Sequence, residues 1–272
     1  MHEALDDLVR ELDGRLEELG RHLTSRRVRL RRQMAAAGLW RCRALLQGMV
    51  ALREAGRTDV LGVLGRALFE THLVSLYVLL KGRDLDDDAV LHELAADHFK
   101  WQKRMVKTAK LPERVAANVE EWEGILRKLE VEPRKLNYER IAEELGPLLE
   151  KVEGAEADVA GMYHILYRGE SLYSAHAGQG ALLRYLQWDD REEADSLITN
   201  PGPPFPGQTR IAALLTTHLA IRVLKAFSVI VEPPLSDVFE RIAALREPGE
   251  AEDEPAGQGV AVDIPEDAEP AP

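Results

Sequence analysis

The stretch VLGVLGRALFETHLVSLYVLL, residues 60–80, decides the fold of this chain. It is long enough for a helix of about six turns, and its apolar side chains lie on nearly all sides, so the helix should be central rather than peripheral. A stretch of this length could also span a membrane. However, Arg66, Glu70 and His72 lie near its middle, and one Lys or Arg at the bilayer centre costs roughly 2.5–3.5 kcal/mol. We therefore predict the central helix of a soluble bundle and no membrane span.

The N-terminal segment carries a heptad seam. Six apolar side chains follow one another at spacings of four and three residues, over about three heptads. They are Leu5, Val9, Leu12, Leu16, Leu19 and Leu23. Two alternatives stay open: the seam packs against the chain's own bundle, or residues 1–24 pair with a second copy of the chain as a coiled coil. We treat residues 1–56 as N-terminal helices that contain this candidate oligomerisation seam.

The rest of the chain has the start and stop signals of further helices and no convincing strand. Gly56 and Gly154 are expected to end helices, and a second long apolar helix is expected from Thr209 to Val231. Residues 156–188 should form a helical region broken at its glycines, followed by an irregular loop over 189–207, which contains NPGPPFPG. The sequence therefore predicts an all-α fold, a multi-helix bundle of about eight to ten helices.

The acidity of the chain is concentrated at its C-terminal end. Residues 247–272 contain nine carboxylates and no Lys or Arg, so most of the net charge of -12 lies there. This segment has almost nothing apolar to bury and cannot offset the entropy of ordering. We expect a disordered acidic tail over 247–272 and a helical body over 57–246; residues 1–246 taken together are nearly neutral.

Two features favour a cytoplasmic protein. Cys42 is the single cysteine, so the chain cannot form an intramolecular disulfide. The N-terminus, MHEALDDLVRELDG, has no basic region followed by an apolar one, as a signal peptide would.

Polar side chains interrupt both long apolar helices. In the first, Arg66 and Glu70 are four residues apart and can pair on one face; His72 lies in the same helix. In the second, His218 and Arg222 have the same spacing. These groups are structural ion pairs and satisfied histidines, or they form a polar centre with a binding or catalytic task.

The most unusual local pattern is Tyr163-x3-Tyr167-Arg168-x2-Ser171-x4-His176. Tyr163 and Tyr167 lie one helical turn apart and share a face, which Ser171 continues. The tyrosines tether a helix to the core through their hydroxyl groups, or the group forms a ligand or catalytic site.

Metal and nucleic-acid signals are weak. HELAADH, residues 92–98, places its histidines six residues apart, whereas two ligands on one helix need a spacing of four; we expect no metal and no cofactor. RRVRLRR, residues 26–32, is a cluster of arginines that suits phosphate contacts but also suits surface ion pairs with the abundant Glu, and such runs are commonly solvated faces. RNA is therefore a candidate partner with little support.

Two segments together resemble a bacterial family of helical proteins of unknown function. They are RALFETHLVSLYVLL, residues 66–80, and YHILYRGESLYSAH, residues 163–176. The family is marked by an Arg-x3-Glu helix and a later Tyr-x3-Tyr-x3-Ser-x4-His pattern. The resemblance implies a helical fold and brings no established activity.

A more distant resemblance is to HEPN-type helical domains, several of which are ribonucleases with an Arg-x4–6-His pair. Arg66 and His72 match this spacing, whereas Arg168 and His176 do not. Two functional hypotheses follow. The first is a binding, regulatory or self-associating bundle with a polar cluster among its central helices. The second is a metal-independent ribonuclease in a toxin or defence setting, with His176 or His72 as general acid or base and Arg168 or Arg66 stabilising phosphate charge.

Overall fold

The computed structural model describes the body of the chain as a helical bundle. The residues described are 2–24, 30–81, 89–108, 113–128, 137–154, 158–168, 186–188, 196–198 and 207–245. They form nine α-helices, a short 3-10 helix (η1, Thr58–Val60), a π-helix (η2, Tyr163–Arg168) and two short strands. The all-α prediction is confirmed. The predicted disordered tail, 247–272, lies outside the described residues.

The order of the α-helices follows the sequence signals closely. They are α1 (His2–Thr24), α2 (Leu30–Glu54), α3 (Leu61–Leu80), α4 (Ala89–Thr108), α5 (Glu113–Lys128), α6 (Tyr138–Glu153), α7 (Val159–Met162), α9 (Gln208–Phe227) and α10 (Leu235–Ala243). Gly56 and Gly154 both have positive φ and follow the ends of α2 and α6, as predicted, because glycine adopts this left-handed conformation without steric cost.

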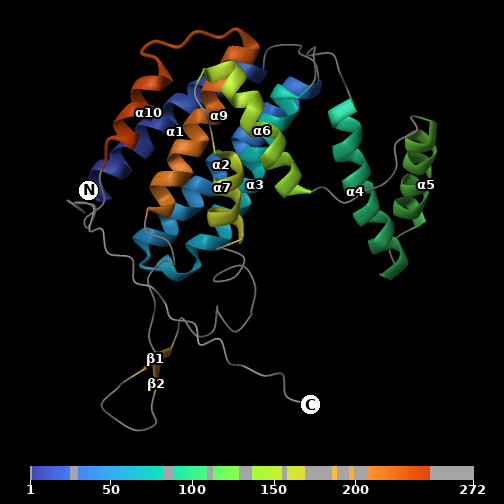
Figure 1. Cartoon of the computed structure of the whole chain (residues 1–272), viewed down its shortest axis with the longest axis horizontal. Coiled ribbons are helices and arrows are strands. Elements are labelled where there is room, and N and C mark those ends of the chain that lie inside the picture. The colour runs from blue at the N-terminus through green and yellow to red at the C-terminus, as the bar shows by residue number, and fades with distance from the viewer. Residues whose placement is uncertain are drawn as a thin grey trace, which may run out of the picture.

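Helix α3 is the central helix, as its composition predicts. It contacts α2, α6 and α9 (Figure 1), and Leu68, Leu73, Leu76 and Tyr77 are completely buried. By length and composition alone, Thr58–Leu80 could cross a membrane. Half of its most apolar 18-residue window is buried inside the protein, which is compatible with a core helix of the bundle.

The heptad seam of α1 is buried within the chain. All six seam residues are at most 6 % exposed, and α1 contacts α2, α9 and α10. Ion pairs extend this packing: Arg43 of α2 holds Asp13 of α1 with two hydrogen bonds, 2.6 and 2.9 Å long. Within the single chain, the seam therefore packs against the chain's own bundle, which is the first of the two alternatives. The buried side chains of α1 and α2 belong to the same core cluster as those of α3, α6, α9 and α10.

The region between α6 and α9 differs from the sequence prediction. Residues 156–188 were expected to be helical in pieces, which is confirmed for residues 159–168, whereas residues 169–185 lie outside the described part of the chain and residues 186–188 form a strand. Leu186–Trp188 (β1) instead pairs antiparallel with Ser196–Ile198 (β2), with Leu186 opposite Ile198. Because β2 is only three residues long, it lacks the alternation over four to eight residues by which a strand is recognised in a sequence.

Candidate functional site

The candidate residues of α3 and η2 meet at one place. Arg66 donates from Nε to Oε1 of Glu70 at 3.1 Å and from Nη2 to the hydroxyl oxygen of Tyr167 at 2.8 Å. The guanidinium carbon also lies 4.3 Å from the centre of the Tyr167 ring. The predicted pairing of Arg66 with Glu70 is confirmed, and Tyr167 joins the pair from 101 residues away.

Two further tyrosines surround Tyr167. The ring of Tyr163 stacks on it, with centroids 4.8 Å apart and an angle of 16° between the planes, and the ring of Tyr138 lies 5.7 Å away. Burial and the nearby charge of Glu70 raise the pKa of Tyr138 to about 12, so its hydroxyl stays neutral. We call Arg66, Glu70, Tyr138, Tyr163 and Tyr167 the Arg66 cluster.

The local backbone explains how the tyrosines reach α3. Tyr163 and Tyr167 lie on the π-helix η2, which directly continues α7 and contacts both α3 and α6. π-Helices are rare in globular proteins, and they occur frequently at functional sites. Their i to i+5 bonding cannot be recognised from side-chain spacing, so the sequence predicts an ordinary helix for this segment.

The two candidate histidines form a second polar group. His72 Nε2 lies 3.2 Å from His218 Nδ1, and His218 Nε2 lies 2.8 Å from Oε1 of Glu153, the last residue of α6. Arg222, one turn after His218 on α9, pairs with the same carboxylate. His72, His218, Glu153 and Arg222 thus form a chain of polar contacts from α3 through α9 to the end of α6, which we call the histidine chain.

Burial and neighbouring charges set the ionisation of Glu153 and His72 in the histidine chain. Burial alone would raise the pKa of Glu153, but the hydrogen bond from His218 and the charges of His218 and Arg222 hold it below the usual value. Glu153 is therefore an ionised acceptor, and His218 Nε2 carries a proton. Burial, together with the nearby His218, holds the pKa of His72 well below 6.5, so the His72 ring is neutral. One ring nitrogen donates to the other across the 3.2 Å contact between His72 Nε2 and His218 Nδ1, and the buried His72 Nδ1 has no hydrogen-bond partner among the described residues.

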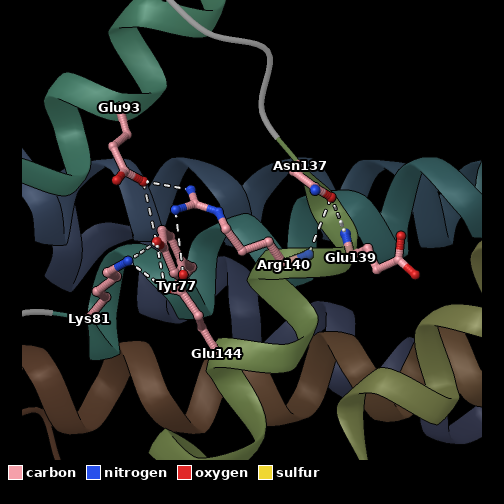
Figure 2. A network of polar contacts seen from close by, with 7 residues as sticks. All are labelled: Tyr77, Lys81, Glu93, Asn137, Glu139, Arg140 and Glu144. Atoms are coloured by element: carbon pink, nitrogen blue, oxygen red, sulfur yellow. Dashed lines mark hydrogen bonds and ion pairs between the residues drawn. The ribbon is translucent and has the colours of Figure 1, made fainter. Parts of the chain in front are cut away.

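A third network was not predicted. Tyr77 is completely buried, and its hydroxyl group lies 3.0 Å from Glu144 of α6 and 3.3 Å from Glu93 of α4. Figure 2 shows Lys81 and Arg140 completing the group: Lys81 contacts Tyr77 and Glu144, and Arg140 donates to Glu93 at 3.1 Å. Two cations balance two carboxylates around one phenol. This arrangement joins α3, α4 and α6, because Glu93 lies 16 and Glu144 lies 67 residues from Tyr77.

The basic cluster RRVRLRR is used partly within the fold. Arg31 is 1 % exposed and donates from Nε to the carbonyl oxygen of Val78 at 2.8 Å, and from Nη2 to that of Lys81. It therefore satisfies carbonyl groups at the C-terminal end of α3, where a positive charge is favourable. Residues 26–29 lie outside the described part of the chain.

The structure brings together some candidate residues and separates others. Arg66 and His72 are six residues apart on α3, about 120° around the helix axis; one contacts η2 and the other α9. Ser171 and His176 lie outside the described residues, as does the side chain of Arg168. Among the described residues, no three His, Cys, Asp or Glu side chains gather in a way that could hold a metal ion.

Comparison with known proteins adds the family. No curated protein and no solved structure matches the chain. Residues 34–194 match the model of a family of unknown function, DUF5677. The match runs from α2 to β1 and includes the whole Arg66 cluster, whereas His218 and Arg222 lie beyond it. This confirms the resemblance to a helical family without an assigned activity, and the chain belongs to the DUF5677 family, a family of unknown function.

Proposed function

We propose that this chain is a binding or regulatory protein that holds a small polar ligand at the Arg66 cluster. The observation that carries the proposal is a guanidinium group that is positioned in advance yet still reached by solvent. The side chains of Arg66 and Glu70 are 18 % and 26 % exposed, and both point to the face where η2 packs. Pre-positioned polar groups beside aromatic rings are typical of small-molecule sites.

The charges of the cluster indicate the class of ligand. Because Glu70 offsets Arg66, the site has no strong net positive charge. The charges of Glu70 and Asp97 both act on Tyr138, which disfavours a strongly anionic ligand. A neutral or zwitterionic molecule that both donates and accepts hydrogen bonds fits best, with the tyrosine rings contributing stacking area.

The ribonuclease alternative has weaker support. His72 is 5 % exposed, its Nε2 is engaged with His218, and the depressed pKa keeps it neutral. A general acid or base must come within hydrogen-bond distance of the group it serves, and an RNA phosphate does not reach a side chain buried between α3 and α9. Arg66 and His72 also face different neighbours, so they do not form one site.

A thermal-shift screen tests the proposal. The full-length chain is melted with and without millimolar nucleosides, amino acids and monosaccharides. At least one compound should raise the melting temperature by about 3 °C, as binding to the native state alone would do at roughly ten times Kd. The shift should shrink in Glu70→Gln and in Tyr167→Phe, and persist in Lys151→Gln, a change on the exposed side of α6. The proposal fails if no compound shifts the wild type, or if both cluster variants respond as the wild type does.

A further inference from the structure

Helices α4 and α5 form an arm that stands apart from the bundle. Figure 1 shows both helices to one side of the packed body. The first turn of α4 enters the main core through Val90 and Leu91. Further along, Phe99 of α4 and Val119 of α5 form a separate small core. The second half of α4 is therefore supported by α5 and exposes its other faces to solvent.

The exposed part of α4 is strongly basic. No Asp or Glu occurs from residue 98 to residue 112. Lys100, Lys103, Arg104 and Lys107 fall within an arc of about 100° when each residue turns the helix by 100°, so they form one stripe, which we call the α4 stripe. Among the described residues, only Lys103 of these four forms an ion pair, with Glu123.

An excess of cations surrounds that single carboxylate. The hydrogen bond from Lys103 and the charges of Lys103, Arg127 and Lys107 lower the pKa of Glu123. Three positive side chains thus lie near one negative one, and Lys100 and Arg104 add to the excess. Residues 1–246 as a whole are nearly neutral, so the α4 stripe is a local feature and not a consequence of overall composition.

An aromatic side chain borders the α4 stripe. Trp101 is 46 % exposed, and the guanidinium carbon of Arg104 lies 5.7 Å from the centre of its ring. Met105, one turn further along, is 53 % exposed. Exposed indole and guanidinium groups are the planar surfaces on which unpaired bases stack, and neighbouring cations follow the phosphates.

We propose that the α4 stripe and Trp101 bind single-stranded nucleic acid. The charge complementarity of four clustered cations with a phosphate backbone carries the proposal, and Trp101 selects single strands, because a duplex does not offer its base faces. A membrane surface fits less well. A helix lying in a bilayer interface needs a broad apolar face, whereas Phe99, on the apolar side of α4, is buried in the small core of the arm.

Fluorescence anisotropy with labelled oligo(U) and oligo(dT) of 20 nucleotides tests this surface on the full-length chain; the two probes separate RNA from DNA. Binding to at least one probe at low salt is expected. A plot of the logarithm of the association constant against the logarithm of the salt concentration should have a slope of about -2 to -3. Three to four phosphate contacts with a single strand predict this slope. Duplexes of the same length should bind more weakly.

Variants on and off the stripe locate the binding. Lys100→Glu/Arg104→Glu/Lys107→Glu should weaken binding at least tenfold, and Trp101→Ala by roughly five- to tenfold. The control Arg10→Glu/Lys151→Glu/Lys225→Glu changes three exposed cations elsewhere by the same total charge and should stay within twofold of wild type. Lys100→Gln/Arg104→Gln/Lys107→Gln removes the charges without reversing them. Circular dichroism melts of every protein show whether a loss of binding comes from a loss of fold.

Three results would overturn the proposal. They are no binding of either probe by a folded wild type at 50 mM salt, equal weakening by the stripe and control variants, and preference for vesicles of phosphatidylcholine and phosphatidylglycerol over both probes. The α4 stripe and the Arg66 cluster lie on different elements. The outcome of the anisotropy experiment is therefore independent of the outcome of the thermal-shift screen.

Discussion

Individual buried polar residues in this bundle are held by partners far away in sequence. His72 is the clearest case, because its neutral ring is buried between α3 and α9 and bonded to His218. An unfolded chain returns this histidine to water, where its pKa is about 6.5. Since the folded pKa is lower, the unfolded state binds one more proton below that pH, and stability falls as the solution is acidified.

The first prediction concerns this pH dependence. The unfolding free energy gained from a neutral His72 should be fully present above about pH 6.5. It should decline as the pH falls toward the lower pKa of His72 in the folded state. Between pH 7 and pH 5 the loss should reach about 2 kcal/mol. His72→Gln keeps a donor for His218 and removes the titration, so its urea midpoint should change less between these pH values. Equal pH dependence in both proteins would show that His72 does not stay neutral.

A second prediction isolates the hydrogen bond between Arg66 and Tyr167. Tyr167→Phe keeps the aromatic ring and removes the acceptor of the 2.8 Å bond, which should cost about 1–2 kcal/mol of unfolding free energy, as expected for a bond to a charged group. Tyr138→Phe is the matched control, because that hydroxyl makes no hydrogen bond to the described residues, and its effect should stay below about 0.5 kcal/mol. Chemical denaturation at pH 7 measures both, and equal effects would argue against the bond.

The sequence predicts local pairs at this scale but not distant ones. Arg66 and Glu70 follow from their spacing of four on one helix. The contacts of Arg66 with Tyr167 and of His72 with His218 join residues 101 and 146 positions apart, and nothing in a single sequence fixes such pairings. Tyr77 was missed for the same reason, since a tyrosine in an apolar run is also typical of an ordinary core position.

At the scale of elements, helix ends were easier to predict than irregular helices. Gly56 and Gly154 mark the ends of α2 and α6 because a left-handed residue is required there. The π-helix η2 and the β1–β2 hairpin have no comparable sequence signal. The separation of the α4–α5 arm from the bundle has no sequence signal either, because it depends on how little of the arm enters the main core.

The network around Tyr77 should hold the arm to the bundle. Arg140→Gln removes the guanidinium group that joins Glu93 of α4 to α6. We expect amide hydrogen exchange in the described part of α4 to become up to about tenfold faster, corresponding to roughly 1 kcal/mol of local stability, while α2 and α9 stay unchanged. Lys151→Gln on the exposed side of α6 is the control. Unchanged exchange in α4, or a uniform increase throughout the chain, would contradict this role.

For the whole molecule, one core cluster spans the chain from α1 to α10. The fold class was predictable because Leu, Ala, Glu and Arg dominate and residues 60–80 had to be buried. The sequence left two partners open for the seam of α1, since a heptad pattern specifies an apolar stripe and not what covers it. The structure covers it with α2, α9 and α10.

Removing α1 tests the importance of that packing. Each of its fully buried Leu or Val side chains contributes about 1.5–3 kcal/mol, and together they are comparable with the total stability of a domain. A chain starting at Ser25 should therefore lose cooperative thermal unfolding and expose apolar surface, as measured by near-ultraviolet circular dichroism and light scattering. A shortened chain that stays monomeric and melts at the wild-type temperature would show that α1 is dispensable.

Native mass spectrometry tests most directly whether the Arg66 cluster holds a small ligand. The full-length chain is purified at low temperature without ligand removal and compared with Glu70→Gln/Tyr167→Phe. We predict that the wild type carries a small molecule that is released on denaturation, and that the double variant carries much less of it. A wild type without any adduct, or equal occupancy in the double variant, would contradict the account.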